Sequence, residues 1–320
     1  MKTFLKYFSL AFICFFMAFL LGTHTFLKMN ANNENDIGSH EEKIKEGEKL
    51  KDNLEKGEEE KGRVNFILLG KDDLRTDSIL FISFDRKLKT VDLISIPRDT
   101  YLYRKGYEKA EQRKINSVYG DHGVEGVKEA LYFILGETPI DHYIILDYKG
   151  VENIIDSVGG VEVNIPFHMK YEDPTANPPL YIDIPKGVQV LNGEKSVQFL
   201  RYRKGSNNKE GYAEGDLGRI KAQQEFVFSF FKKSLGIRLP LVIKNSFKEI
   251  ETDMGLNEAL KYGKEILEME EEDFNLFILP GVASYRTFEG KTLSYYIQDE
   301  VKTKELMEKI YKASKKVPVE

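Results

Sequence analysis

The chain has 320 residues, of which 41% are hydrophobic and 31% are charged, and its formal net charge is −5. At roughly 100 to 200 residues per domain this length allows one large domain or two ordinary ones, and the acidic balance argues against a protein that binds nucleic acid through overall positive charge. A single cysteine, Cys14, excludes an intramolecular disulfide framework and any multi-cysteine zinc or iron–sulfur site, and the five scattered histidines lack the spacing of paired metal ligands.

The amino terminus predicts a membrane anchor. Lys2 and Lys6 precede an uncharged run of 21 residues, 7–27, which as a helix rising about 1.5 Å per residue spans a hydrocarbon layer of roughly 30 Å. The run is longer than the apolar region of a cleaved signal peptide. The lysines place residues 1–6 in the cytoplasm and the rest of the chain outside the cell. Residues 28–63 carry dense mixed charge and no aromatic residue, which predicts a solvated extracellular tether.

From Val64 onward short apolar runs alternate with helical stretches, which predicts one α/β domain over residues 64–320. Strands rich in β-branched and aromatic residues are expected at 64–70, 78–84, 90–97, 142–148, 160–166, 274–280 and 282–289. A helix is expected to end at Gly136, a good C-cap residue. Further helices are expected at 151–159, 193–203, 216–235, 239–250, 256–270 and 299–314.

Candidate chemistry is concentrated in turns that follow the predicted strands, where α/β folds place their ligands. The first turn, GKDDLRTDS at 70–78, holds three acidic residues and one arginine: Asp72, Asp73, Arg75 and Asp77. Pro97 stops the third strand and presents Arg98 and Asp99 at its end.

Two later segments add further charged and amide side chains. Arg201 and Arg203 lie two residues apart at a predicted helix end, and Asp216, Arg219 and Gln223 fall on one face of the next helix. A single cluster of this kind is usually only solvated. In this lysine-rich chain, however, the turns use arginine, whose planar fork grips phosphate oxygens in a bidentate way. Arginine beside carboxylate therefore predicts a site for an anionic substrate that requires a metal ion.

Seven motifs follow one another from about Val64 to Phe231 in an order that closely resembles the LytR-CpsA-Psr (LCP) family of Gram-positive envelope proteins: LLGKDD, RTDSI, SIPRDT, KINSVY, GGVEVNIPF, LNGEKSVQFLRYR and GDLGRIKAQQ. The resemblance implies a three-layer α/β/α sandwich with a central mixed sheet, preceded by one transmembrane helix. It implies a transferase anchored in the cell membrane with its C-terminal domain extracellular. Its substrates would be an anionic glycopolymer of teichoic acid or capsule type on a polyprenyl-pyrophosphate carrier, and a muramic-acid hydroxyl of peptidoglycan.

Carried over by motif position, the resemblance implies that Asp72 and Asp77 bind Mg²⁺, with Mn²⁺ as the alternative ion and Asp73 as the rival ligand to Asp72. It implies that seven side chains contact pyrophosphate: Arg75, Arg98, Lys114, Arg201, Arg203, Arg219 and Gln223. Three residues would serve catalysis: Arg98, Asp77 and Arg75. Asp99 and Asp216 would orient arginines. Lys221 stands where the family usually has arginine, and lysine keeps the charge without the fork.

The implied reaction is a phosphoryl transfer in which the muramic-acid hydroxyl attacks the glycan-side phosphorus and polyprenyl phosphate leaves. The lipid needs an apolar slot, for which residues 225–231 and 131–135 are candidates. Two alternatives stay open. One is a polyprenyl-pyrophosphate phosphohydrolase that uses water as acceptor, and the other is a non-enzymatic, membrane-tethered regulator of the envelope. Binding to nucleic acid is not expected, because the domain is predicted to lie outside the cell and no basic helix-turn-helix surface is visible.

Overall fold

The computed structural model describes residues 62–176, 179–206, 211–234, 239–267 and 269–313. The predicted anchor at 7–27 and nearly all of the predicted tether lie outside these residues. Among the helices of the described ranges, none has both the length and the hydropathy that crossing a bilayer requires.

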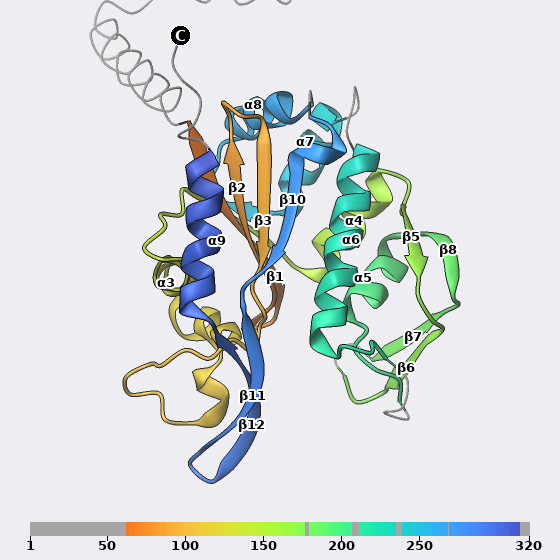
Figure 1. The fold of residues 1–320 in the computed structure, drawn as a ribbon. Coiled ribbons are helices and arrows are strands. Elements are labelled where there is room, and N and C mark those ends of the chain that lie inside the picture. Colours follow the sequence, from red (N-terminus) through yellow and green to blue (C-terminus); the bar gives the residue numbers. More distant parts are fainter. Residues whose placement is uncertain (1–61, 177–178, 207–210, 235–238, 268, 314–320) are drawn as a thin grey trace, which may run out of the picture. The chain divides into compact units, whose positions relative to one another are not determined.

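A mixed sheet of six strands forms the centre of the domain (Figure 1). Its strands follow in the order β10 (Phe274–Ile278), β3 (Thr90–Ser95), β2 (Arg75–Asp85), β1 (Arg63–Asp72), β4 (His142–Leu146) and β9 (Glu251–Thr252). β2 runs antiparallel to both β1 and β3, whereas β4 is parallel to β1 and β10 is parallel to β3. As a result, β1, β3, β4 and β10 all end at the same edge of the sheet, and β2 begins there.

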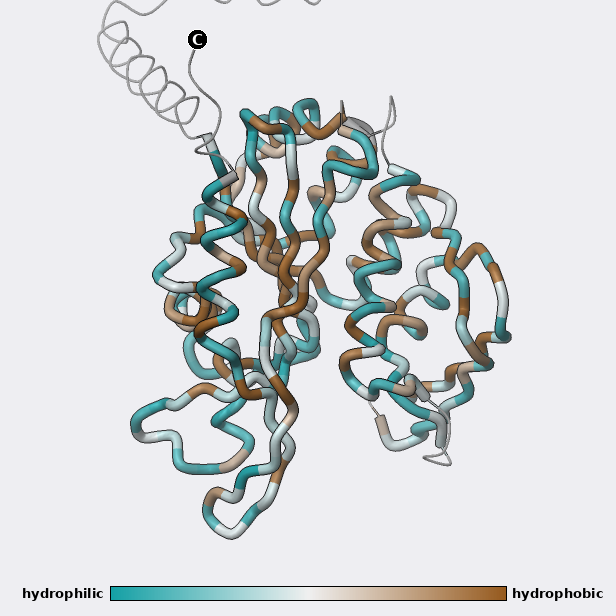
Figure 2. Tube along the Cα trace, in the orientation of Figure 1, coloured by the Kyte–Doolittle hydropathy of each residue, from teal (hydrophilic) through white to brown (hydrophobic). Residues whose placement is uncertain are grey.

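Side chains alternate between the two faces of this sheet because strand residues point up and down in turn. On one face, Ile67, Phe81 and Ile94 pack under α3 (Val118–Ile134) and α9 (Glu300–Ala313). On the other face, their neighbours Phe66, Phe84 and Leu93 pack with residues of α8 (Leu256–Ile266). Figure 2 shows the apolar residues following the strands through the centre. The predicted α/β fold with a central mixed sheet is confirmed.

A second hydrophobic core lies beside two short antiparallel strand pairs, β5 with β8 and β6 with β7. Its elements are α4 (Tyr148–Ser157), β5 (Val161–Ile165), β6 (Met169–Asp173), β7 (Leu180–Ile184), β8 (Gly187–Leu191), α5 (Gly193–Arg201) and α6 (Asp216–Ser234). Helix α6 contributes Ala222 and Phe226 to this core, while Val227 packs against a core of the main sheet. Helix α6 therefore has one side on each core.

The remaining elements are shorter or lie at the ends of the sheet. They are η1 (Ala110–Arg113), η2 (Ile115–Ser117), α7 (Leu239–Ser246), η3 (Phe247–Glu249), η4 (Glu271–Asp273), β11 (Gly281–Phe288) and β12 (Lys291–Gln298). The predicted strands and helices are present with ends displaced by a few residues, and Gly136 takes the left-handed conformation of a helix C-cap, with φ of 67°. The sequence analysis did not predict β6, β7, β8, β9 or β12.

Candidate functional site

The predicted turn residues meet at the edge where the parallel strands end. Asp72 is the last residue of β1, Asp77 lies near the start of β2, and Arg98 follows β3. Asp72 and Asp77 both line a pocket at this edge. Asp73 instead sits exposed in the turn between β1 and β2, with a left-handed φ of 54°. In the structure, Asp72 lines the pocket and its neighbour Asp73 does not.

This polar pocket has a volume of about 290 Å³. Its walls come from the ends of β1 and β4, the starts of α4 and α6, the end of α5 and the β6–β7 pair. Six basic side chains line it against four acidic ones: Lys71, Arg98, Arg201, Arg203, Lys204 and Arg219 against Asp72, Asp77, Asp147 and Asp173. An excess of cations in a concave site favours a ligand with more than one negative charge.

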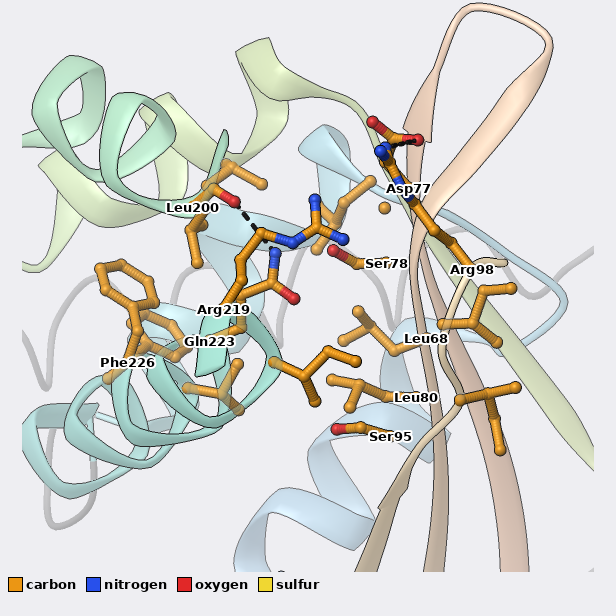
Figure 3. A pocket seen from close by; sticks show the side chains of 18 of the residues that line it. Leu68, Asp77, Ser78, Leu80, Ser95, Arg98, Leu200, Arg219, Gln223 and Phe226 are labelled. Carbon is orange, nitrogen blue, oxygen red and sulfur yellow. Dashed lines mark hydrogen bonds and ion pairs between the residues drawn. The ribbon is translucent and has the colours of Figure 1, made fainter. Parts of the chain in front are cut away.

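Arg98 is held by an ion pair with Asp77, in which Nη1 lies 2.7 Å from Oδ1 (Figure 3). Burial on its own lowers the pKa of Arg98, but the carboxylates of Asp77, Asp99 and Asp216 outweigh it, so that the pKa is raised. Arg98 therefore stays fully charged although it is largely buried. Among the described residues its buried Nε finds no hydrogen-bond partner.

Arg219 is only 4% exposed and extends from α6 toward the strand that carries Asp77 and Ser78 (Figure 3). Its Nη2 lies 2.8 Å from Asp216 Oδ1. Burial is the main reason why the pKa of Arg219 is lowered, and the nearby cations Arg98 and Arg203 lower it further. Its Nε also lacks a hydrogen-bond partner within the part of the chain that the structure describes. Burying a guanidinium with unmade hydrogen bonds lowers the stability of the folded protein. A phosphate oxygen that accepted a hydrogen bond from it would recover part of that stability.

Tyr148 lines the polar pocket together with Asp72 and Arg201. The guanidinium of Arg201 lies 4.4 Å from the centre of the Tyr148 ring. Burial raises the pKa of Tyr148, so the hydroxyl keeps its proton. Arg203 lies at the rim, where its Nε is 4.0 Å from Asp216 Oδ1.

Sequence reasoning missed Tyr148, together with other side chains that line the polar pocket: Lys71, Asp147, Asp173 and Lys204. One signal could have found Tyr148. Tyr148 is the last residue of the predicted strand at 142–148, and parallel strands bring their ends to one edge, as they do for Arg98 after the strand at 90–97. Asp173 and Lys204 belong to segments that carry no strand-end pattern.

An apolar cavity of about 190 Å³ adjoins the polar pocket and lies between the sheet and α6. Asp77, Arg98 and Arg219 line both spaces. Gln223 also lines both, and its Nε2 donates to the Leu200 carbonyl at 2.9 Å, which ties α6 to the end of α5. The walls beyond these polar groups are aliphatic and aromatic and include Leu68, Leu80 and Phe226 (Figure 3).

A second apolar cavity of about 260 Å³ lies among α6, α7, α8 and the sheet. Ile154, Phe230 and Phe231 line both apolar cavities, so the polar pocket and the two apolar cavities form a series. The predicted lipid slot at 225–231 is therefore on the wall of a real cavity. The prediction for 131–135 is wrong, because α3 packs on the opposite face of the sheet. Leu131, Ile134 and Leu135 are buried in the core there, whereas Tyr132 and Phe133 are exposed.

Two predicted pyrophosphate contacts, and the lysine that stands at a family arginine position, lie away from the pocket. Within the described residues, the walls of the polar pocket and the adjoining cavity include neither Arg75 nor Lys114. Arg75 is exposed and interacts electrostatically with Glu111. Lys114 Nζ lies 2.8 Å from Asp99 Oδ1, so Asp99 pairs with a lysine as well as contributing to the field at Arg98. Lys221 is on the exposed side of α6, where it pairs with Glu214 at 2.6 Å.

The carboxylates of the polar pocket are its candidate ligands for a metal ion. In the part of the chain that the structure describes, no group of three or more histidine, cysteine, aspartate or glutamate side chains could hold one. Asp72 and Asp77 nevertheless line one pocket from the two sides of the β1–β2 turn. Mg²⁺ is usually held by one or two carboxylates, with substrate phosphates and waters completing the shell. The pair therefore fits an ion that arrives with a phosphorylated ligand.

Comparison with known proteins places these features in a family. The model of the LytR_cpsA_psr family matches residues 25–312. The chain is 28% identical over 190 residues to the Bacillus subtilis polyisoprenyl-teichoic acid–peptidoglycan teichoic acid transferase TagV, which is 58% of this chain and 46% of that protein. It is 30% identical over 184 residues to the regulatory protein MsrR of Staphylococcus aureus, or 55% of this chain and 51% of that protein. The chain thus spans about half the length of the curated relatives it matches.

Solved structures show the same fold. The crystal structure of B. subtilis TagV superposes with a TM-score of 0.66 at 23% identity, covering 81% of this chain and 100% of that one. A structure of TagT bound to LI-WTA gives a TM-score of 0.63 at 21% identity, covering 79% and 90%. At these identities the likeness establishes the fold alone.

Proposed function

Because this chain belongs to the LytR-CpsA-Psr family, we propose that it transfers an anionic glycopolymer of teichoic acid or capsule type from a polyprenyl-pyrophosphate carrier to a muramic-acid hydroxyl of peptidoglycan. The observation that carries this proposal is the junction at Asp77, Arg98 and Arg219, where a cationic pocket opens into an apolar cavity. A ligand with a diphosphate joined to an isoprenoid chain has the same two parts in the same order. The similarity to TagV, which is named a teichoic acid transferase, supports the same proposal.

The diphosphate would lie among the arginines of the polar pocket. Arg98 and Arg219 each keep a buried Nε without a partner, and Arg201 and Arg203 add charge from the opposite wall. Guanidinium groups suit phosphate because their donors form a planar fork. Arg75 and Lys114 lie outside this wall, so we propose contacts from them only to the more distant parts of a large substrate.

Asp72 and Asp77 would hold Mg²⁺, or Mn²⁺ in its place, together with oxygens of the diphosphate. The ion would offset negative charge on the phosphates, as divalent cations do in phosphoryl transfer. The protein's part would be to orient the carboxylate of Asp77 through its ion pair with Arg98.

In the proposed reaction the acceptor oxygen forms a bond to the glycan-side phosphorus. The bond from this phosphorus to the bridging oxygen breaks, and polyprenyl phosphate leaves with the electron pair. The hydroxyl proton passes to a carboxylate of the polar pocket, because its described lining contains no histidine or cysteine. Arg98, Arg201 and Arg219 would offset the charge on the non-bridging oxygens, which is electrostatic stabilisation by groups already in place.

The predicted anchor at residues 7–27 completes the proposal. A membrane-held enzyme with its domain outside the cell would meet both a lipid-linked donor and the wall. This is a single-pass arrangement with residues 1–6 in the cytoplasm, as the flanking lysines favour.

The proposal is tested with the full chain in detergent micelles, a lipid-linked glycan, peptidoglycan oligomers and Mg²⁺. A new phosphodiester-linked product should form, and Arg98→Ala, Asp77→Ala or a chelator should each abolish it. Lys221→Ala is the matched control, since Lys221 is exposed and paired with Glu214. A product that survives all three treatments rejects this site. Release of prenyl phosphate without an acceptor would instead identify a phosphohydrolase. If the protein shows no turnover and cells that carry Arg98→Ala keep the phenotype of the parent, the protein is a regulator.

A further inference from the structure

We propose that a second pocket beside the polar pocket is the subsite for the acceptor, a muramic acid that carries its peptide. This edge pocket has a volume of about 290 Å³ and lies where β1 and β4 end, next to η3 and β9. Its charged lining residues are three lysines and three acids: Lys71, Lys149, Lys248, Asp147, Glu249 and Glu251. The inference rests on the proposed function and adds to it the side from which the acceptor hydroxyl arrives.

The polar pocket stands between the edge pocket and the first apolar cavity. It shares Lys71 and Asp147 with the edge pocket, and it shares Asp77, Arg98 and Arg219 with the apolar cavity. Among the residues that the structure describes, the edge pocket and that cavity have no lining residue in common. A ligand in the polar pocket can therefore be reached from two different sides.

The alternation of side chains along β4 explains this separation. Ile145 lines the edge pocket and its neighbour Leu146 lines the apolar cavity, because successive strand residues point to opposite faces. Glu251 of β9 is paired with Ile145 in antiparallel register and points to the same face. Lys71 is on this side too, since its Nζ lies 5.7 Å from the ring centre of Tyr119 in α3. The edge pocket and the apolar cavity thus lie on opposite faces of the sheet.

This arrangement fits an in-line displacement at phosphorus. In phosphoryl transfer the attacking and leaving oxygens stand on opposite sides of the phosphorus atom. The proposed leaving group, polyprenyl phosphate, extends toward the apolar cavity, so the acceptor hydroxyl has to approach from the other side. That side is marked by Lys71 and Asp147, where the edge pocket meets the polar pocket.

The charges of the edge pocket favour the acceptor over the anionic donor glycan. Its basic and acidic side chains are equal in number, so a polyanion gains no net attraction there, whereas cations are in excess in the polar pocket. Lys149 and Lys248 each pair with a neighbouring glutamate, at 3.0 and 3.4 Å. Within the described ranges, neither Lys71 nor Glu251 has an ion-pair partner.

An unpaired cation and an unpaired anion suit a ligand that carries charges of both signs. A muropeptide has carboxylates along its peptide and an ammonium group on its diamino acid, next to the sugar that offers the hydroxyl. We expect Lys71 to bind a carboxylate and Glu251 to bind the ammonium group. Lys71 is half-buried and Glu251 is exposed, so the contact from Lys71 should contribute more to affinity.

Binding of a soluble disaccharide–peptide muropeptide to the full chain in detergent tests the assignment. Saturation-transfer NMR measures its Kd, and calorimetry measures the Kd of inorganic pyrophosphate. Lys71→Met should raise the muropeptide Kd about 10-fold, and Glu251→Gln about threefold. Because Glu251 does not line the polar pocket, Glu251→Gln should leave the pyrophosphate Kd unchanged. Lys170→Met and Glu162→Gln, matched exposed changes on β6 and β5, should alter neither Kd.

Two further measurements identify the group that each side chain binds. The disaccharide without its peptide has no ammonium group, so its Kd should not respond to Glu251→Gln. In transfer kinetics, Glu251→Gln should raise the KM for the muropeptide by the same threefold and leave the KM for the lipid-linked donor unchanged. Equal thermal unfolding of the variants and the parent would show that folding is intact.

The outcomes distinguish this inference from the proposed function. If the parent transfers glycan to the muropeptide but both variants keep its Kd and KM, the edge pocket is not the acceptor site and the proposed function stands. A rise in the KM for the donor with Glu251→Gln would place the donor glycan there and overturn the assignment. If the parent neither binds the muropeptide nor transfers glycan to it, both proposals are rejected. Should Lys71→Met fail to fold, Glu251→Gln alone decides.

Discussion

Arg219 is a charged residue in a largely apolar wall. Its side chain is 4% exposed, its pKa is lowered by burial, and among the described residues its one ion pair is with Asp216. Removing a charge from water costs several kcal/mol, of which a single partner repays only a part. A buried residue that lowers the stability of the folded protein is typically one that serves function.

Replacement of Arg219 should separate activity from stability. Arg219→Met keeps the length of the side chain and removes the charge, so we expect glycopolymer transfer to fall by about 100-fold or more. The free energy of unfolding should be unchanged or rise by about 1 kcal/mol, because Asp216 remains partly exposed and near Arg203. Transfer assays and urea unfolding measure the two quantities. Lys221→Met, the same exchange on the exposed side of α6, should alter neither, and a fully active Arg219→Met would contradict the role assigned to this charge.

At the scale of elements, α6 shapes the apolar part of the site. Ile154, Phe230 and Phe231 stand between the two apolar cavities. Under the proposed function, a short lipid would fill the first cavity alone, whereas a long one would have to pass these side chains to reach the second. The partition therefore predicts a response that depends on lipid length.

Enlarging the partition tests this expectation. Phe230→Trp should raise the KM for a long polyprenyl carrier roughly 10-fold, since overpacking a tight site costs about 1 to 3 kcal/mol. The KM for a geranyl carrier should stay the same. The control is Phe228→Trp, since Phe228 on the same helix contacts Phe274 and is not among the described residues that line these cavities. Equal losses with both carriers would show that the partition does not divide the lipid path.

A salt bridge fixes α8 to the end of β2. Arg86 donates to Glu265 from Nε at 2.8 Å and from Nη2 at 2.6 Å. These hydrogen bonds from Arg86 are the main reason why the pKa of Glu265 is lowered from its ordinary value of 4.5. A carboxyl whose pKa is lower in the folded state stabilises the protein above its unfolded pKa. That stabilisation is lost as the pH falls below 4.5 and through the folded pKa.

The lowered pKa of Glu265 predicts how the stability of the Glu265→Gln variant depends on pH. At pH 7 we expect urea unfolding to show the variant less stable than the parent by about 1 kcal/mol. The gap should close at a pH well below 4.5, where the parent's carboxyl is also neutral. Glu305→Gln, an exposed change on α9, should show no comparable gap. If the difference in stability persists in acid, the packing of the Glu265 side chain and not its charge holds α8 in place.

The elements that sequence reasoning found and missed differ in burial. β1, β2 and β3 are nearly continuous apolar runs because both of their faces are covered. β6 reads MKYED and exposes Lys170 and Glu172, so its apolar signal rests on two residues. β9 is two residues long and is defined by pairing with β4 alone. Such strands depend on tertiary neighbours, which a local pattern does not contain.

The residues of the candidate site also divide into those that a local sequence pattern predicts and those that it does not. Asp72, Asp77 and Arg98 were predictable because the ends of parallel strands share one edge, and Arg219 and Gln223 because helical spacing places them together. Tyr148 stands just beyond the end of β4, so the same rule applies to it. The exposed position of Arg75 was not predictable, because a register shift at Gly70 and Lys71 interrupts the alternation of the β1–β2 turn.

At the scale of the whole domain, the ligand site lies between two hydrophobic cores. One wall is the main sheet, with Leu68 and Leu80, and the other is α6, with Phe226 from the second core. Gln224 joins the walls directly, because its Nε2 donates to Ser95 Oγ at 2.9 Å and to the Phe277 carbonyl at 2.7 Å. A ligand that fills the cavity would add contacts to both walls and so oppose their separation.

Ligand-dependent thermal stability tests that arrangement. Farnesyl diphosphate at about 100 times its Kd should stabilise the folded full chain by about 2.7 kcal/mol, which corresponds to a rise in Tm of roughly 5 to 10 °C for a domain of this size. Inorganic pyrophosphate and farnesol, each able to fill one part of the site, should give smaller rises. Arg219→Met should reduce the response to farnesyl diphosphate to that of farnesol. If farnesol alone equals farnesyl diphosphate in the parent protein, the arginines take no part in binding, and the junction between polar pocket and apolar cavity does not recognise a lipid diphosphate.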